Sequence, residues 1–412
     1  MPLGDHCGVY RQKITRTDRL GNQVNTKSTR GKIGISGIGA VTAYGWGRER
    51  LWDGLVTGKP AAALTAGYGE SPEDCGWVAR VREGGDPADG SSRFARAMRA
   101  AAREAVTDAG ARGWQPGRRV GLLHAVVLGE VDLWRDFYLK HHGKRTKREF
   151  LALMPSTPMS TLMQEYGFTG PVMNVSAMCA SGNAGLLTAK SWLDSGIVDD
   201  VVLVATDLSA TRENVRNFAE LGVVITDAEP LDACRPFQQG SRGFIMGEAS
   251  VAMVLSRRAA DPYARLLGGA MTHDAFHVTS IDPALHQVRR CFTEALADAG
   301  VPGSAVRYLN AHGPGTKQCD AAETAMLETE LSERARVYSV KPLVGHCQAA
   351  AASLELAVAA MSYRRGVIPA PPTVAAGHPR LLAGCSPNHG GITVKSALGM
   401  GGHNSVVVIA AA

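Results

Sequence analysis

The stretch NVSAMCASGNAGLL, residues 174–187, places one cysteine between an apolar run and a series of small residues. Asn174 and Val175 are typical of the end of a strand and residues 184–193 of a helix, so Cys179 is predicted at a strand-to-helix turn. Unpaired N–H groups and the helix dipole at such a turn lower the pKa of a thiol and favour the nucleophilic thiolate. The alternative is a buried core cysteine, because cysteine is among the most buried residue types.

Outward from this turn, predicted strands alternate with predicted helices. Strands are expected within 32–36, 118–129, 199–207, 306–310 and 390–411, and helices within 91–110, 288–300 and 351–366. After Arg258 the pattern starts again, which indicates an α/β protein with a duplicated core. We therefore expect an N-terminal extension over residues 1–30, a first half over 31–258 and a second half over 259–412.

Composition narrows the class of protein. Of the 412 residues, 45% are hydrophobic and 20% are charged, as in ordinary globular proteins. No apolar run reaches the roughly 18 residues of a membrane helix, and the N-terminus lacks the apolar core of a secretory signal. The net charge of +6 is too small to indicate nucleic-acid binding, although it suits an acidic partner. The eight cysteines have no paired spacing, so we expect neither disulfides nor a cysteine metal site, and a cytoplasmic location.

Two histidine segments could supply partners for the cysteine. His312 follows a predicted strand in LNAHGPGTKQCDAAE, and His346 precedes a predicted helix in SVKPLVGHCQAAAASLE. Taken singly, each residue also has an ordinary interpretation. A histidine beside glycine is usually a loop residue, Lys341 a solvated charge, and Asp320 and Glu323 charges that suit the first turn of a helix.

Taken in order, these segments resemble the β-ketoacyl-acyl carrier protein synthases, the condensing enzymes of fatty acid and polyketide synthesis. VSAMCASGNAGL, LNAHGPGT, SVKPLVGHCQAAAASLE and SALGMGGHNS carry the resemblance, together with ISGIGAVTAYG and CRPFQQGSRGFIMGEASVAMVL. It extends from about Lys32 to Ala410. It implies the thiolase fold, in which two related α/β halves form a five-layered αβαβα arrangement, usually in a dimer.

The resemblance also implies a role for each motif residue. Cys179 would carry the acyl group, and neutral His312 and His346 would assist decarboxylation of a malonyl thioester and stabilise the enolate. The backbone N–H groups of Cys179 and Met400 would form the oxyanion hole. The remaining expected site residues are Lys341, Asp320, Glu323 and Glu355 as the supporting network, Thr316 for the phosphopantetheine arm, Phe218 and Met400 for the acyl pocket, and Arg93 and Arg96 for carrier docking.

The sequence departs from the family pattern around these residues. Pro314 stands where the family has a threonine that binds the pantetheine arm, Met400 replaces the gating phenylalanine, and QQGSRGF lacks the usual charges after RPF. We therefore expect a specialised biosynthetic enzyme. No cofactor or metal is expected, because the substrates would arrive on the phosphopantetheine arm of an acyl carrier protein. The chain would form a homodimer, or a heterodimer with a related subunit.

Three functions agree with the motifs. The first is decarboxylative Claisen condensation of a Cys179-bound acyl group with a malonyl thioester. The second is transfer of that acyl group to an amine, alcohol or thiol without decarboxylation. The third is a non-catalytic partner that resembles a chain length factor, although such subunits typically lack the nucleophile. A thiolase is disfavoured, because SALGMGGHNS lacks the second catalytic cysteine.

Overall fold

The computed structural model describes residues 32–140, 146–154 and 156–412. The expected extension over residues 1–30 lies outside them. Ten strands form one continuous series in the order β11-β10-β14-β15-β9-β1-β8-β7-β5-β6. Their bounds are β1 Ile33–Thr42, β5 Val120–Ala125, β6 Val172–Val175, β7 Asp200–Asp207, β8 Ala249–Ser256, β9 Ala264–His273, β10 Val306–Asn310, β11 Arg336–Tyr338, β14 Ile392–Gly399 and β15 His403–Ala411.

The series consists of two sets of five strands with one topology. In the first set the order β1-β8-β7-β5-β6 has two antiparallel pairs followed by two parallel pairs. In the second set β9-β15-β14-β10-β11 repeats that sequence of pairings. If the five strands of each set are numbered by their order along the chain, their order across the sheet is 1-5-4-2-3 in both sets. Among the described strands, the two sets join only where β1 pairs with β9, over Ile33–Leu266 and Gly34–Arg265. The repeat is weak in sequence and complete in topology.

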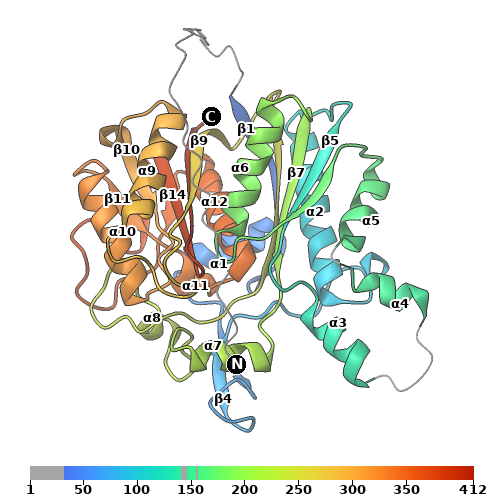
Figure 1. The fold of residues 1–412 in the computed structure, drawn as a ribbon, viewed down its shortest axis with the longest axis horizontal. Coiled ribbons are helices and arrows are strands. Elements are labelled where there is room, and N and C mark those ends of the chain that lie inside the picture. Colours follow the sequence, from blue (N-terminus) through green and yellow to red (C-terminus); the bar gives the residue numbers. More distant parts are fainter. Residues whose placement is uncertain (1–31, 141–145, 155) are drawn as a thin grey trace, which may run out of the picture. The chain divides into compact units, whose positions relative to one another are not determined.

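Two central helices, α6 (Ser181–Asp194) and α12 (Gln348–Arg365), pack against each other between the two sets (Figure 1). Helix α6 contacts β5, β7, β9 and β15, and α12 contacts β7, β8, β10 and β14. Small residues allow this close packing, because a Cβ at Gly182 would lie 2.5 Å from the Ser353 nitrogen. Residues 348–362 of α12 are all buried, which explains its alanine-rich sequence.

Outer helices cover the far face of each set. Helix α2 (Arg93–Ala111) packs on β1, β7 and β8, with the Ser92 hydroxyl capping it by accepting the Ala95 N–H at 3.0 Å. Helix α9 (His286–Ala299) packs on β9 and β15. The layers therefore follow one another as helix, sheet, helix, sheet and helix, which confirms the five-layered arrangement.

Shorter elements connect these layers. They are β2 Gly45–Trp46, α1 Arg48–Val56, β3 Ala63–Ala66, β4 Cys75–Val78, η1 Pro87–Asp89, α3 Val131–Arg135, η2 Asp136–Lys140, α4 Lys147–Ala152, α5 Thr157–Tyr166, α7 Arg212–Glu220, α8 Pro230–Ala233, η3 Gly303–Ala305, α10 Lys317–Thr329, α11 Lys341–Val344, β12 Val367–Pro369 and β13 Cys385–Pro387. Among the described residues, none of the helices has the length and apolar character needed to cross a membrane.

Candidate active site

Cys179 lies in the turn between β6 and α6, as predicted, and its side chain is buried. The turn is closed by Ser181, whose hydroxyl accepts the Ala177 N–H at 2.8 Å and donates to the Met178 carbonyl at 2.6 Å. Met178 has a φ of 50°, a left-handed conformation that is uncommon for a residue with a side chain. The turn thus fixes the sulfur beside the start of a central helix.

The expected low pKa of this thiol is wrong. Burial raises the pKa of Cys179 to about 11, although Lys341 and the backbone N–H groups of Met400 and Cys179 oppose the shift. Desolvation of a thiolate therefore outweighs the favourable dipoles at the turn. The resting sulfur is a thiol, and it must transfer its proton when it attacks.

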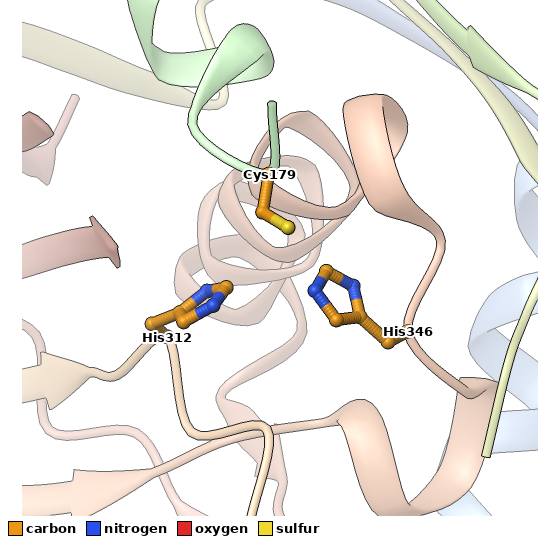
Figure 2. Close-up of side chains that lie close together, drawn as sticks. All are labelled: Cys179, His312 and His346. Carbon is orange, nitrogen blue, oxygen red and sulfur yellow. The ribbon is translucent and has the colours of Figure 1, made fainter. Parts of the chain in front are cut away.

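His312 and His346 both point toward the sulfur (Figure 2). His312 follows β10, and His346 lies between α11 and α12. The two ring centroids are 5.3 Å apart and the rings are nearly perpendicular. One donor atom from each histidine and the Cys179 sulfur all lie within 4.8 Å of one another. Residues from both sets of strands therefore meet at one point.

Both imidazoles are neutral. Burial lowers the pKa of His312 well below its usual value, and Lys341, His346 and Lys395 lower it further. Burial likewise lowers the pKa of His346, with the same two lysines adding to the effect. The Nδ1 atom of His346 is buried without a hydrogen-bond partner among the described residues. A neutral ring can accept a proton at one nitrogen and donate from the other.

A buried charged network holds the segment around His312. The two carboxylate oxygens of Glu323 accept the backbone N–H groups of His312 at 2.6 Å and Gly313 at 2.8 Å. The Lys341 ammonium donates to the carbonyl of His312 and pairs with Glu355 at 2.7 Å. Three of the expected supporting residues therefore fix the backbone that carries the imidazole.

The sequence analysis missed a second buried lysine, Lys395 on β14. Its ammonium lies 2.8 Å from Glu355 and donates to the carbonyls of Ala311 at 3.1 Å and Ser396 at 2.6 Å. Burial lowers the pKa of Lys395 to about 8. The sequence did contain a sign of this lysine. It lies within the apolar run ITVKSAL, and residues inside an apolar strand are usually buried.

Met400 follows β14 and approaches the nucleophile through its backbone. Its backbone N–H and that of Cys179 act on the sulfur by lowering the pKa of the thiol, against the larger effect of burial. The preceding Gly399 makes this approach possible, since a Cβ there would lie 3.0 Å from the Ala177 carbonyl oxygen and 3.3 Å from the Cys179 nitrogen. The oxyanion hole formed by the N–H groups of Cys179 and Met400 stays a prediction that this close approach of the two segments allows.

The three reactive side chains lie on the wall of a cavity of about 600 Å³. Its lining residues include Cys179, Leu221, Val223, Arg242, Phe244, Ser280, His312, Pro314, Thr316, Lys317, Cys319, His346, Gln348, Leu398 and Met400. Thr316 and Met400 are both on this wall, and their expected roles toward the pantetheine arm and the acyl group stay predictions. Phe218, which was expected in the acyl pocket, is not among the lining residues, and its ring packs against the buried cluster of Tyr68, Val215 and Phe244. The turn after α7 brings Leu221 and Val223 to the cavity instead.

Asp320 lies outside the cavity wall. One of its carboxylate oxygens accepts the Phe237 N–H at 2.9 Å, and the other is buried without a partner among the described residues. Burial raises the pKa of Asp320 to about 7. Phe237 has a φ of 61°, so this carboxyl group supports a left-handed backbone position in the RPF loop.

Arg93 and Arg96, which were expected to dock the carrier, are both largely buried. The Arg93 side chain is 11% exposed and its guanidinium donates to the Val81 carbonyl and to buried Glu248. The Arg96 side chain is 14% exposed and donates to the Gly84 carbonyl at 2.8 Å. Both guanidinium groups lie against loops that pack beside α2, because internal acceptors are available there.

The Cys179, His312 and His346 donors could also hold a metal ion, because cysteine and histidine are the preferred ligands of zinc. The same three groups can instead perform acyl transfer, which needs a nucleophile, a proton acceptor and donors for an oxyanion. Geometry alone allows both, and comparison with known proteins separates them.

Two family models cover most of the chain. The model of the beta-ketoacyl synthase N-terminal domain matches residues 30–260, and that of the C-terminal domain matches residues 263–375. The first range contains Cys179 and the second contains His312 and His346. The chain therefore belongs to the β-ketoacyl synthase family, whose members are acyltransferase-type condensing enzymes.

Curated relatives agree with this assignment. The tetracenomycin polyketide synthase ketoacyl synthase alpha subunit of Streptomyces glaucescens is 31% identical over 376 residues, which cover 84% of this chain and 87% of the relative. The 3-oxoacyl-[acyl-carrier-protein] synthase 2 of Coxiella burnetii is 26% identical over 410 residues, which cover 92% of this chain and 98% of the relative. The chain is thus similar to ketosynthases of both polyketide and fatty acid synthesis.

Solved structures agree on the fold. One match is a chain from the structure of a type II polyketide acyl-carrier protein in complex with its ketosynthase, bound to a hexaketide. It matches at a TM-score of 0.80 and 23% identity, over 93% of this chain and 100% of that one. A ketosynthase in complex with its chain length factor from Xenorhabdus doucetiae matches at a TM-score of 0.79 and 22% identity, over 94% and 100% of the two chains. These likenesses confirm the thiolase fold.

Proposed function

We propose that this chain joins an acyl group on Cys179 to a malonyl thioester by decarboxylative Claisen condensation, in a specialised polyketide or fatty acid pathway. The observation that carries the proposal is the meeting of a buried thiol and two neutral imidazoles on one cavity wall. Neutral imidazoles suit this reaction, because each can donate a hydrogen bond to a developing oxyanion without first losing a proton.

The first half-reaction loads the acyl group. The Cys179 sulfur attacks the carbonyl carbon of the donor thioester while a neighbouring imidazole takes the thiol proton. When the donor's carbon–sulfur bond breaks, the imidazole passes that proton to the departing thiolate, which leaves as a thiol. Because the thiol pKa is about 11, proton transfer accompanies the attack. The N–H groups of Cys179 and Met400 would hold the tetrahedral oxyanion.

The second half-reaction forms the carbon–carbon bond. The malonyl carboxylate leaves as carbon dioxide, and its electron pair forms a thioester enolate stabilised by donors from His312 and His346. The enolate carbon then attacks the acyl carbonyl, and the Cys179 sulfur leaves as a thiolate that takes one proton from solvent. Lys341 and Lys395, both paired with Glu355, hold the carbonyls of His312 and Ala311 throughout.

An acyl carrier protein is the proposed substrate carrier. The cavity wall includes the cationic side chains Arg242 and Lys317 and the hydroxyls of Ser280 and Thr316. Such a lining suits a phosphopantetheine arm, which has one anionic phosphate and several polar amides. Substrates would therefore arrive covalently attached, and no other cofactor is proposed.

A dimer is the proposed assembly, with a second copy or a related subunit. Strand β6 pairs only with β5 among the described strands, so one of its edges is open. Val172 and Met173 on this strand are 39% and 40% exposed. An open apolar edge readily pairs with another strand. Light scattering on the wild type and on Met173→Lys tests this, since an unchanged dimer in the variant would contradict the proposed edge.

A reducing cytoplasm is the proposed location. Seven cysteines lie in the described residues and all of them are free thiols. Free buried thiols are typical of proteins from reducing compartments.

Acyl transfer without decarboxylation remains the second candidate, because Pro314 on the cavity wall lacks the hydroxyl expected there. Mass spectrometry of the carrier product separates the two reactions. With malonyl carrier present, condensation releases carbon dioxide and adds two carbons to the chain. Transfer to an added amine, alcohol or thiol without release of carbon dioxide would contradict the condensation proposal. A non-catalytic chain-length subunit would do neither.

A further inference from the structure

Gln348 is held in an unusual conformation beside the nucleophile. It is the first residue of α12, and its φ of 41° lies in the left-handed region that side chains disfavour. Its side chain is buried and lies on the wall of the cavity that contains Cys179. Backbone strain and burial of an amide both cost free energy, so this position needs an explanation beyond packing.

Only one of the two polar atoms of the Gln348 amide has a hydrogen-bond partner among the described residues. Its Oε1 lies 3.8 Å from the Cys179 sulfur, as the acceptor of the thiol proton. Its Nε2 is buried without a hydrogen-bond partner among the described residues. Buried donors are rarely left unpaired, because the free energy lost on removing the donor from water is then not offset by a new hydrogen bond. A ligand atom is the partner that the cavity can supply.

Acylation of Cys179 removes the remaining partner. The donor thioester's carbon–sulfur bond breaks, a new one forms to Cys179, and the thiol proton leaves with the donor thiol. Oε1 then has no thiol proton to accept, and the whole amide faces the first atoms of the acyl group. With the amide 3.8 Å from the sulfur, those atoms are the ones within its reach.

We propose that Gln348 determines substrate specificity, by donating a hydrogen bond to a ketone or hydroxyl oxygen on one of the first few carbons of the Cys179-bound acyl group. This inference rests on the proposed acylation of Cys179. A site that pairs a buried donor with a substrate oxygen discriminates against the analogue without that oxygen, because the donor is then left unpaired. A plain hydrocarbon chain would leave Nε2 without a partner.

The test compares loading of Cys179 by butanoyl and 3-oxobutanoyl pantetheine thioesters, followed by intact-protein mass spectrometry. The variant Gln348→Met keeps the unbranched side chain and its approximate length but removes both polar atoms. We expect the ratio of 3-oxobutanoyl to butanoyl loading rates to fall about tenfold in the variant. The different reactivities of the two thioesters cancel, because the same pair is used with both proteins.

Gln318→Met is the matched control, since Gln318 is an exposed glutamine on the same cavity wall. It should keep the wild-type ratio, and an equal fall there would overturn the inference. Gln348→Leu serves as a second variant if Gln348→Met does not fold. Equal ratios in the wild type and the Gln348 variant would also overturn it. Absence of loading by either thioester in every protein would instead overturn the proposed acylation of Cys179, and this inference with it.

Discussion

The two halves of the sheet can be compared at the junction that follows the third strand of each set, counted along the chain. In the first half, β6 leads to Cys179 at the start of α6, and in the second, β11 leads through α11 to His346 at the start of α12. Each junction contains a left-handed residue, Met178 or Gln348. Because α6 and α12 pack together, equivalent positions of the repeat bring a nucleophile and an imidazole face to face (Figure 2).

The halves differ after their second strand. In the second half, β10 leads to His312 and to the carbonyls held by Lys341 and Lys395. In the first half, β5 leads to the buried apolar residue Val126. One half therefore supplies the nucleophile, and the other supplies both imidazoles and the buried charges that hold the segment around His312. A duplicated scaffold can divide a reaction in this way, since each copy needs to keep only part of the machinery.

The largest expected effect comes from removing the nucleophile. Cys179→Ala should abolish acyl loading, because the site then has no sulfur to form a thioester. Intact-protein mass spectrometry after incubation with an acyl donor, followed by peptide mapping, measures this. Cys75→Ala, which removes an exposed cysteine, is the control and should load normally. An adduct on Cys319, which also lies on the cavity wall, would show that the halves divide the chemistry differently.

Removing either imidazole should separate the two half-reactions. His312→Ala and His346→Ala should lower the condensation rate by on the order of a hundredfold, because each removes one donor to the enolate oxygen. Loading of Cys179 should stay measurable in both variants, since the thiol and the backbone N–H donors are unchanged. Single-turnover assays of loading and of carbon dioxide release provide the two rates. Wild-type condensation by both variants would rule out the proposed role of the second half.

Most of the fold was predictable, because helix and strand periodicity is a local property. The strand order was not, since the pairing of β9 with β15 and of β10 with β14 joins segments far apart in sequence. Residue identity also could not show that α12 would be buried on all sides. The resemblance to a known family supplied the layers that periodicity could not.

Within the site, the motif cysteine and histidines were predictable and their environment was not. The pKa of Cys179 depends on burial by segments from both halves, so the turn alone gave the wrong direction. Lys395 was missed because its partner, Glu355, lies forty positions earlier in sequence, on another element. The sequence also did not show that Leu221, three positions after Phe218, lines the cavity while Phe218 packs against a buried cluster.

A smaller effect is expected from Lys395, which faces Glu355, Lys341 and Glu323 from three other elements. Its pKa is about 8, so it is charged below that pH and neutral above it. Both histidines stay neutral across this range, because their pKa values are already well below the usual value. The condensation rate should therefore fall as pH rises through about 8, as the lysine loses its charge and its hold on the carbonyls.

Lys395→Met should remove this basic limb and lower the rate below pH 8 by about tenfold, since charge-assisted hydrogen bonds are the stronger ones. A pH–rate profile of single-turnover condensation measures both effects. Lys190→Met is the control, because Lys190 pairs with Asp194 away from the cavity. If the rate of Lys395→Met still fell as pH rises through about 8, the decrease would come from the titration of another group.

The smallest effect on catalysis is expected from the buried charges of the first half. Arg93 pairs at 3.1 Å with Glu248, a fully buried carboxylate, whereas the partner of Arg96 is the largely exposed Glu83. Arg93→Met should lower the free energy of unfolding by about 3 kcal/mol, because it leaves a buried carboxylate with less compensation. Arg96→Met should cost about 1 kcal/mol, because its carboxylate partner is exposed to water and what is lost inside is a hydrogen bond to a carbonyl. Urea denaturation gives both values.

The Arg93 effect should also depend on pH. Burial raises the folded-state pKa of Glu248 to about 7, above its unfolded value, so its contribution to stability is fully present below about pH 4.5 and is lost as pH rises through 7. Loss of Arg93 should therefore cost more at pH 8, where the carboxylate is charged, than at pH 5, where it is protonated.

Condensation of a small soluble thioester should change little in either Arg93→Met or Arg96→Met. If Arg96→Glu raised the Michaelis constant for carrier-bound substrate alone, the arginine would meet the carrier despite its internal bonds, and the first half would bind substrate as well as react with it.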